Sequence, residues 1–198
     1  MALKIILIIT IPCIVVFTIM PERLLNILYS NKLNAFGYDG LKISARLLVW
    51  SGFGIVFLAI SQVYSSSLQA IEKRFATIRN LSIAVIVKFI IELLFLPSRH
   101  LNILTLAIAN TACYITMMVL NHFEIKQYFN IKVDYMFAVK LAFANFASVF
   151  AMIIVMILSN SVINTIIAGL FGVLVYFYSL MKLKILNKRD LAMLKYKV

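Results

Sequence analysis

"IAVIVKFIIELLFLP", residues 83–97, is an apolar segment that carries two charged residues near its middle. These are Lys88 and Glu92, four positions apart, so an α-helix would place them on one face within reach of each other. Charged side chains are costly in hydrocarbon and rare within transmembrane segments. What the pair means therefore depends on the kind of chain that surrounds it.

The surrounding chain is more apolar than a soluble domain of its length. Of its 198 residues, 64% are hydrophobic, and its mean hydropathy is +1.02. A soluble domain needs polar side chains to cover its surface, whereas a helix of about 20 apolar residues crosses a bilayer. The apolar runs are continuous rather than alternating, which excludes the strands of a membrane barrel. The sequence therefore predicts an all-α integral membrane protein.

Six apolar runs are long enough to span a membrane. We expect helices over residues 3–20, 46–70, 78–96, 103–120, 135–158 and 162–181. Pro12 lies inside the first run and predicts a kink there. The connection after that run is mildly apolar, which indicates a short interfacial helix before a turn at Gly37–Gly40.

The basic residues predict the orientation of these spans. The net charge is +12, and 13 of the 19 basic residues fall on one side, five on the other, with Lys88 inside a span. The larger set comprises Lys4, Lys73, Arg74, Arg79, Lys126, Lys132, Lys140, Lys182, Lys184, Lys188, Arg189, Lys195 and Lys197. An excess of Lys and Arg marks cytoplasmic loops, so both termini are expected in the cytoplasm. The basic tail, residues 182–198, either lies on the anionic inner leaflet or acts only as a topology signal.

Membrane topology and lipid attraction account for this charge, and no motif for nucleic-acid recognition is present. Cys13 and Cys113 both fall in apolar runs and are expected to be buried free thiols. The sequence has no CxxC motif, no Cys/His cluster and no phosphate-binding loop, so we expect neither a metal nor a cofactor. Glu92 is the one acidic residue deep in a span, which argues against an intramembrane enzyme.

Two places in the expected spans are polar. The end of the second span reads "AISQVYSSSLQA", residues 59–70, and lipid cannot satisfy polar atoms on all sides of a helix. This end either packs closely against another helix or lines a hydrophilic cavity. Lys88 either faces such a cavity and meets an anionic substrate group, or forms a purely structural pair, or lies in a misassigned span. The candidate cavity residues are Lys88, Glu92, Gln62, Ser65 and Gln69.

Several segments, in this order, resemble the C-terminal half of polysaccharide flippases of the multidrug/oligosaccharidyl-lipid/polysaccharide exporter superfamily. They are "IPCIVVFTIMPERLLNILY" (11–29), "SQVYSSSLQAIEK" (61–73), "VKFIIELLFLP" (87–97), "LNILTLAIANTACYITMMVLN" (101–121) and "VKLAFANFASVFAMI" (139–153). The nearest group is that of the stage V sporulation protein B. Lys88 and Pro97 match its Lys–Asn–Pro pattern, with Glu92 where Asn is usual. Ala70, Glu72 and Thr105 stand where that family usually has Gly, which implies altered close packing.

The resemblance implies part of a MATE-like bundle in a bacterial cytoplasmic membrane, moving lipid-linked saccharides by alternating access. Residues 1–160 would form the family-like region, and residues 161–198 the final span and basic tail. Relatives have fourteen helices, so a missing N-terminal bundle or a partner chain is implied, besides membrane lipids and the lipid-linked saccharide. Two alternatives stay open: a small six-helix substrate-binding subunit of a transporter, or a non-transporting remnant that pairs with a full-length flippase.

Overall fold

The computed structural model describes residues 2–33, 37–97, 103–129, 135–158 and 161–185. These residues form seven helices and no strand. In chain order they are α1 (Ala2–Ile19), α2 (Pro21–Leu33), α3 (Gly37–Ala70), α4 (Arg74–Phe95), α5 (Leu104–Lys126), α6 (Tyr135–Leu158) and α7 (Val162–Lys182). Five of them, namely α1, α3 from Gly40 onward, α5, α6 and α7, are long and apolar enough to cross a membrane. The chain therefore has the character of a multi-pass membrane protein.

The fourth helix, α4, differs from these five by its charges. Its 22 residues reach about 33 Å at ~1.5 Å per residue, which is long enough to cross the hydrocarbon. It carries Arg74 at its first position and Arg79, Lys88 and Glu92 further along its length. Whether α4 can lie in a membrane therefore depends on where the last three of these side chains lie.

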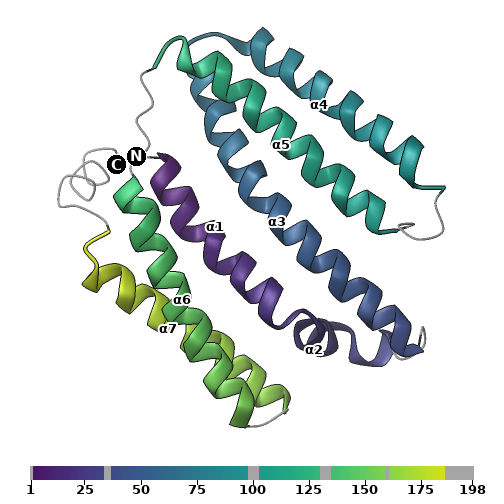
Figure 1. The fold of residues 1–198 in the computed structure, drawn as a ribbon, viewed down its shortest axis with the longest axis vertical. Coiled ribbons are helices and arrows are strands. Elements are labelled where there is room, and N and C mark those ends of the chain that lie inside the picture. Colours follow the sequence, from purple (N-terminus) through teal and green to yellow (C-terminus); the bar gives the residue numbers. More distant parts are fainter. Residues whose placement is uncertain (1, 34–36, 98–102, 130–134, 159–160, 186–198) are drawn as a thin grey trace. The chain divides into compact units, whose positions relative to one another are not determined.

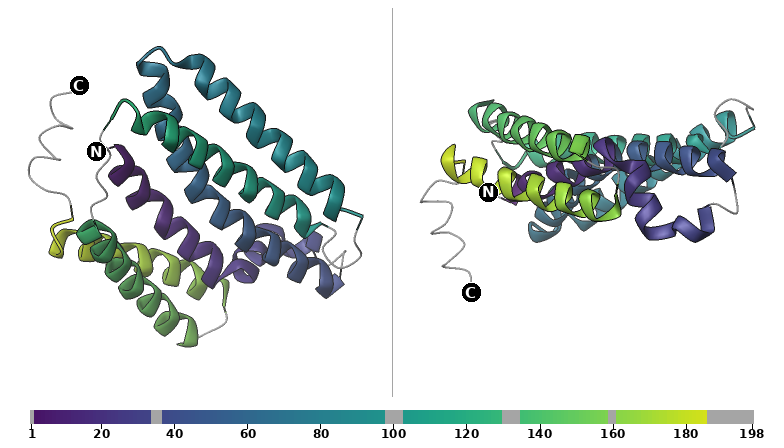
Figure 2. Two further views of the ribbon diagram at one scale, coloured as in Figure 1. Left: turned by 45° about the horizontal axis from the view of Figure 1, so that its top comes forward. Right: turned by 90° about the horizontal axis from the view of Figure 1, so that it is seen from below.

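The chain divides into two compact units, of which the larger covers Ala2–Ile131. In this unit α5 packs against both α3 and α4, while α1 and α2 pack against α3. Figures 1 and 2 show α5 lying between α3 and α4, with α1 along the other side of α3. The spatial order α1–α3–α5–α4 thus differs from the chain order, and α5 is the helix through which α3 and α4 are held together.

Each expected run contains a helix, but α3 and α4 begin earlier than expected, at Gly37 and Arg74, and α5 continues past residue 120 to Lys126. The short helix expected in the connection after the first run is present as α2, with non-helical backbone angles at Tyr29 (φ −133°, ψ 16°), and α1 continues as one helix through Pro12. The expected turn at Gly37–Gly40 is wrong, because these residues form the first turn of α3. Glycine costs about 1 kcal/mol in a helix interior, but extending a helix that is already nucleated adds one backbone hydrogen bond per residue. Residues 37–40 therefore join α3 as helix, although their composition favours a turn.

The connection from α3 to α4 is a short C-terminal cap. The amide of Lys73 donates to the carbonyl of Leu68 at 2.9 Å, and that of Glu72 to Gln69 at 3.0 Å. Glu72 has a φ of 63°, in the left-handed region that usually holds glycine in such caps. This cap turns the chain sharply, so that α4 begins beside the end of α3.

The smaller unit, which begins at Lys132, contains the helix pair α6 and α7. The hydroxyl of Ser148 on α6 donates to the carbonyl of Gly172 on α7 at 2.8 Å. A Cβ at Gly172 would lie only 2.2 Å from Cγ of Met152, a side chain that is 1% exposed. Ser161 caps the start of α7 by accepting from the amide of Asn164. Close backbone approach at Gly172 therefore holds the two helices together.

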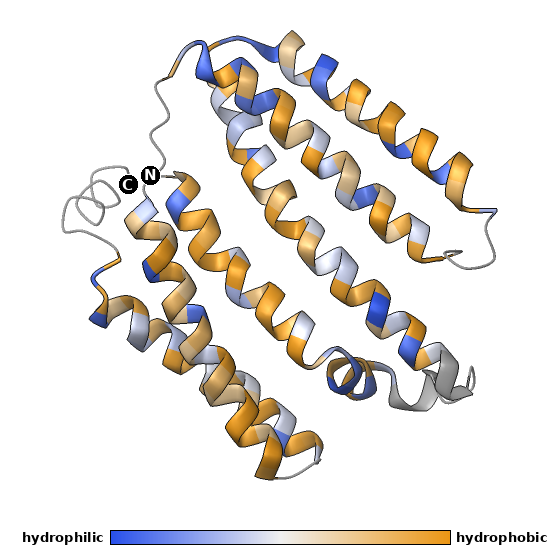
Figure 3. Ribbon diagram, in the orientation of Figure 1, coloured by the Kyte–Doolittle hydropathy of each residue, from blue (hydrophilic) through white to orange (hydrophobic). Residues whose placement is uncertain are grey.

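The distribution of side chains is that of a protein in lipid. Large apolar residues such as Phe75, Leu93 and Phe146 are strongly exposed, whereas Ser61, Asn80 and Asn121 are buried between helices. Figure 3 shows hydrophobic residues along most of α1, α6 and α7, whereas α2 is largely hydrophilic and hydrophilic residues recur along α4. Small and polar residues at helix contacts, with large apolar ones outside, are typical of membrane helices.

Candidate functional site

The side of α4 that faces α5 places Lys88 and Glu92. Asn80 and Ala84 are buried on this side, and Ala84 packs with Cys113 and Met117 of α5. Residues four positions apart share a helix face, so Lys88 and Glu92 continue the line that Asn80 and Ala84 begin. The charged pair therefore lies along the contact with α5 rather than on the outward surface of α4.

The exposure of neighbouring side chains supports this placement. The side chains of Lys88 and Glu92 are 34% and 21% exposed, whereas Phe89 and Leu93, one position further on, are 60% and 63% exposed. Around Lys88 and Glu92 the outward face of α4 is thus apolar, and these two charges are turned partly into protein, whereas the side chain of Arg79, nearer the start of the helix, is 62% exposed. In a bilayer, this part of α4 would present Phe, Ile and Leu to the hydrocarbon.

Lys88 and Glu92 form a loose ion pair. Nζ of Lys88 lies 3.7 Å from Oε1 of Glu92, which is longer than the 2.7–2.9 Å of a tight charge-assisted hydrogen bond. An ammonium group has three donors, so this contact leaves Lys88 able to bind another acceptor. The pair lowers the cost of burying each charge without fully satisfying either group.

A second polar group joins α3, α4 and α5 nearer the start of α4, and we call it the asparagine cluster: Asn80, Asn121, Ser61 and Ser65. Nδ2 of Asn80 donates to Oδ1 of Asn121 at 3.0 Å, and Nδ2 of Asn121 donates to Oγ of Ser65 at 2.9 Å. Oγ of Ser61 lies 3.5 Å from the same Nδ2. All four side chains are buried. One asparagine of α5 thus connects the two helices on either side of it.

Polar contacts continue outward from the asparagine cluster toward the helix ends. Arg79 of α4 forms a 2.7 Å ion pair with Glu124 of α5. The hydroxyl of Tyr64 on α3 lies 3.1 Å from Nδ1 of His122 on α5. The side chains of this ion pair are 62% exposed for Arg79 and 19% exposed for Glu124. These contacts join the end of α3, the start of α4 and the end of α5.

The five candidate cavity residues occupy three different places. Lys88 and Glu92 form their own pair, and Ser65 belongs to the asparagine cluster. Gln62 and Gln69 are exposed on α3. Lys88 lies two turns along α4 from Asn80, about 12 Å at ~1.5 Å per residue. The structure therefore does not gather the five around one space in this unit, and their joint role in a cavity stays a prediction.

The sequence reading did not include Asn80, Asn121, Arg79 or Glu124 among the functional candidates. Their signal is visible in retrospect, because Asn80 and Asn121 are each amides at the edge of an otherwise apolar run. Of the two alternatives for residues 59–70, close packing holds at Ser61 and Ser65, which are buried against Asn121 of α5. A Cβ at Gly54 would lie 3.0 Å from Oγ1 of Thr111 on α5. The face of α3 that carries these small residues is the one that α5 covers.

Within the described residues, no three His, Cys, Asp or Glu side chains are grouped so that they could hold a metal ion. Cys113 is buried, whereas Cys13 is exposed, so the expectation of two buried thiols holds for Cys113 alone. Comparison with protein-family models, with curated proteins and with solved structures found no match. The function is therefore inferred from the geometry of α3, α4 and α5 and from the motifs of the sequence.

Proposed function

We propose that this chain is the C-terminal part of a bacterial flippase for lipid-linked oligosaccharide or polysaccharide precursors. It acts in the cytoplasmic membrane by alternating access, with six spans and both termini in the cytoplasm. The observation that carries the proposal is the Lys88–Glu92 pair on the α5-facing side of α4. Ionisable residues kept inside membrane helices usually face a bundle interior or an aqueous path, and they mark substrate sites.

The chemistry of the pair suits a phosphate-bearing headgroup. Lys88 supplies a positive charge with donors that Glu92 does not occupy, because their contact is loose at 3.7 Å. The oxygens of a pyrophosphate would bind these donors by charge-assisted hydrogen bonds. Glu92 keeps the site close to neutral when it is empty and competes with the substrate for Lys88. Binding is thus reversible, as transport requires, and no covalent bond is made or broken.

The asparagine cluster supports the mechanical part of the proposal. Alternating access needs groups of helices that move as rigid bodies around a central site. The hydrogen bonds of Asn121 and the Arg79–Glu124 ion pair tie α3, α4 and α5 together at one end. These helices would therefore carry Lys88 as one body, against a second bundle supplied by further chain or by a partner.

Replacing Lys88 tests the proposal. Lys88→Ala should abolish delivery of the lipid-linked saccharide to the outer leaflet without lowering the amount of protein in the membrane. Lys88→Arg keeps the charge and should retain part of the transport. The measurement is outer-leaflet precursor in the native cells, alongside an immunoblot of the membranes. Arg74→Ala is the matched control, because Arg74 is an exposed cation at the start of the same helix. Normal transport by Lys88→Ala would overturn the proposal.

A further inference from the structure

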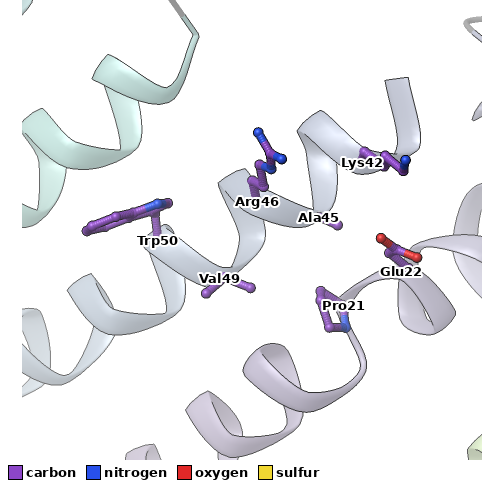
Figure 4. Close-up of a pocket in the computed structure, with 7 residues that line it drawn as sticks. All are labelled: Pro21, Glu22, Lys42, Ala45, Arg46, Val49 and Trp50. Atoms are coloured by element: carbon purple, nitrogen blue, oxygen red, sulfur yellow. The ribbon is translucent and has the colours of Figure 1, made fainter. Parts of the chain in front are cut away.

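A cavity of about 340 Å³ lies away from both polar groups described above, where α2 begins beside the start of α3. Figure 4 shows its lining residues on these two helices: Pro21, Glu22, Lys42, Ala45, Arg46, Val49 and Trp50. Small-molecule pockets in proteins start at about 300 Å³, so a compact polar group fits this one. Arg46 lies 15 residues from Ser61 along α3, about 22 Å at ~1.5 Å per residue, so the cavity is distinct from the asparagine cluster.

The charges that line this cavity have both signs. Lys42 and Arg46 lie on successive turns of α3, and Glu22 lies in the first turn of α2 on the other side. Arg46 has no hydrogen-bond or ion-pair partner within the part of the chain that the structure describes. Lys42, Arg46 and Glu22 thus give the lining of the cavity groups of both signs, and this suits a ligand with a negative and a positive group.

The position of the cavity along the helices points to lipid as the source of that ligand. The strongly apolar helix α1 ends at Ile19, two residues before Pro21, so the cavity lies where hydrocarbon gives way to headgroups. Trp50 borders it and is 45% exposed, and tryptophan is enriched at this level of a bilayer. Pro21, Ala45 and Val49 give the cavity an apolar lining beside its charges.

We propose that this cavity binds the headgroup of a zwitterionic phospholipid with a primary ammonium group. The phosphodiester would bind Lys42 and Arg46, and the ammonium would bind Glu22, while the apolar lining contacts the glycerol. An anionic headgroup without an ammonium group leaves Glu22 facing a like charge and binds less well. The inference does not rest on the flippase proposal, because it concerns binding at other residues.

Native mass spectrometry of the purified full chain tests this site. The chain is titrated with phosphatidylethanolamine and, separately, with phosphatidylglycerol. The unsubstituted chain should retain phosphatidylethanolamine several-fold better. Arg46→Gln should lower that retention about tenfold, as expected for a lost charge-assisted hydrogen bond. Arg46→Lys should keep most of it, and Glu22→Gln should remove the preference between the two lipids.

Lys126→Gln is the matched control, because it removes an exposed positive charge from the last turn of α5. Circular dichroism of each variant checks that its helices are intact. A second experiment adds soluble glycerophosphoethanolamine, which has the headgroup without acyl chains. If it displaces the bound lipid, the headgroup alone accounts for binding; if the lipid stays bound, the acyl chains contribute as well. Both outcomes support the site. Equal retention of the two lipids by the unsubstituted chain would overturn the proposal. So would unchanged retention by Arg46→Gln, or an equal loss in Lys126→Gln.

Discussion

Asn121 is the residue at which three helices of the larger unit converge. Its amide accepts from Asn80 and donates to Ser65, and it is fully buried. In lipid, an amide without a protein partner has no water to bond with, so Asn80 and Ser65 rely on Asn121 for their hydrogen bonds. Hydrogen bonds between membrane helices average about 0.6 kcal/mol, and a buried group left without a partner adds to that loss.

Replacing Asn121 should therefore destabilise the helix bundle. We expect Asn121→Ala to lower the free energy of unfolding by about 1–2 kcal/mol, measured by unfolding of the purified chain in detergent. Asn110→Ala is the control, because Asn110 lies on the same helix and has no hydrogen-bond partner among the described residues. It should change stability by less than about 0.5 kcal/mol. Equal losses in the two variants would show that the cluster contributes no specific stability.

At the scale of elements, the cap between α3 and α4 holds Glu72 in the left-handed conformation. Its φ is 63°, and the flippase family that the sequence resembles usually has glycine at this position. A residue with a Cβ costs about 1–2 kcal/mol in that conformation. The chain thus has local strain at the turn that sets α4 beside α3.

Glu72→Gly should relieve this strain. The gain is offset in part because glycine gives the unfolded chain more freedom, by about 0.4–1 kcal/mol. We expect a net stabilisation of about 0.5–1 kcal/mol, measured by unfolding in detergent. Glu72→Ala distinguishes the effect of the charge from that of the backbone strain, because it removes the carboxylate and keeps the Cβ. This variant should not stabilise the chain. A gain of the same size in Glu72→Ala would assign the effect to charge.

Two glycines of α7 provide a matched test of the α6–α7 contact. A Cβ at Gly172 would lie 2.2 Å from Cγ of Met152, whereas one at Gly169 would meet nothing within 4 Å. Met152 is buried and has little room to move, so Gly172→Ala should destabilise the helix pair by about 1–3 kcal/mol. Gly169→Ala should be neutral or stabilising, because alanine favours helix. The unfolding midpoints of the two variants should thus shift in opposite directions or by clearly different amounts.

At the scale of the whole molecule, the flippase proposal requires a second bundle of helices. An antibody raised against residues 182–198 should detect, in native membranes, either a product much heavier than 22.5 kDa or a 22.5 kDa chain that co-purifies with further membrane helices. A lone 22.5 kDa chain that is stable and binds a small molecule tightly would contradict the proposal. That result would favour the substrate-binding subunit.

The apolar runs predicted the helices well because lipid imposes a simple requirement on the backbone. Every amide and carbonyl in hydrocarbon must be paired within its own helix, so a run of sufficient length is read directly from composition. The expected helix over residues 135–158 coincides with α6, and α7 differs from its expected range by one residue. The division into family-like region and final span, at residue 160, stays a prediction.

Polar ends of helices were harder to predict, because tertiary contacts decide them. We expected the fourth run to end at residue 120, but α5 continues to Lys126. The continuation packs Ile125 against Tyr64 and Leu68 of α3 and brings Glu124 to Arg79. The same side chains would suit an interfacial loop, and only the presence of α3 and α4 beside them favours helix.

The sequence by itself determined that this chain is helical and suited to a membrane, and that Lys88 and Glu92 share one face. These follow from apolar length and helical period, which are local properties of the chain. Only the tertiary structure decided that α5 lies between α3 and α4, that the charged face of α4 turns toward α5, and that Asn80 meets Asn121. Such pairings join residues 41 positions apart, and they depend on which helix faces fit together rather than on any local pattern.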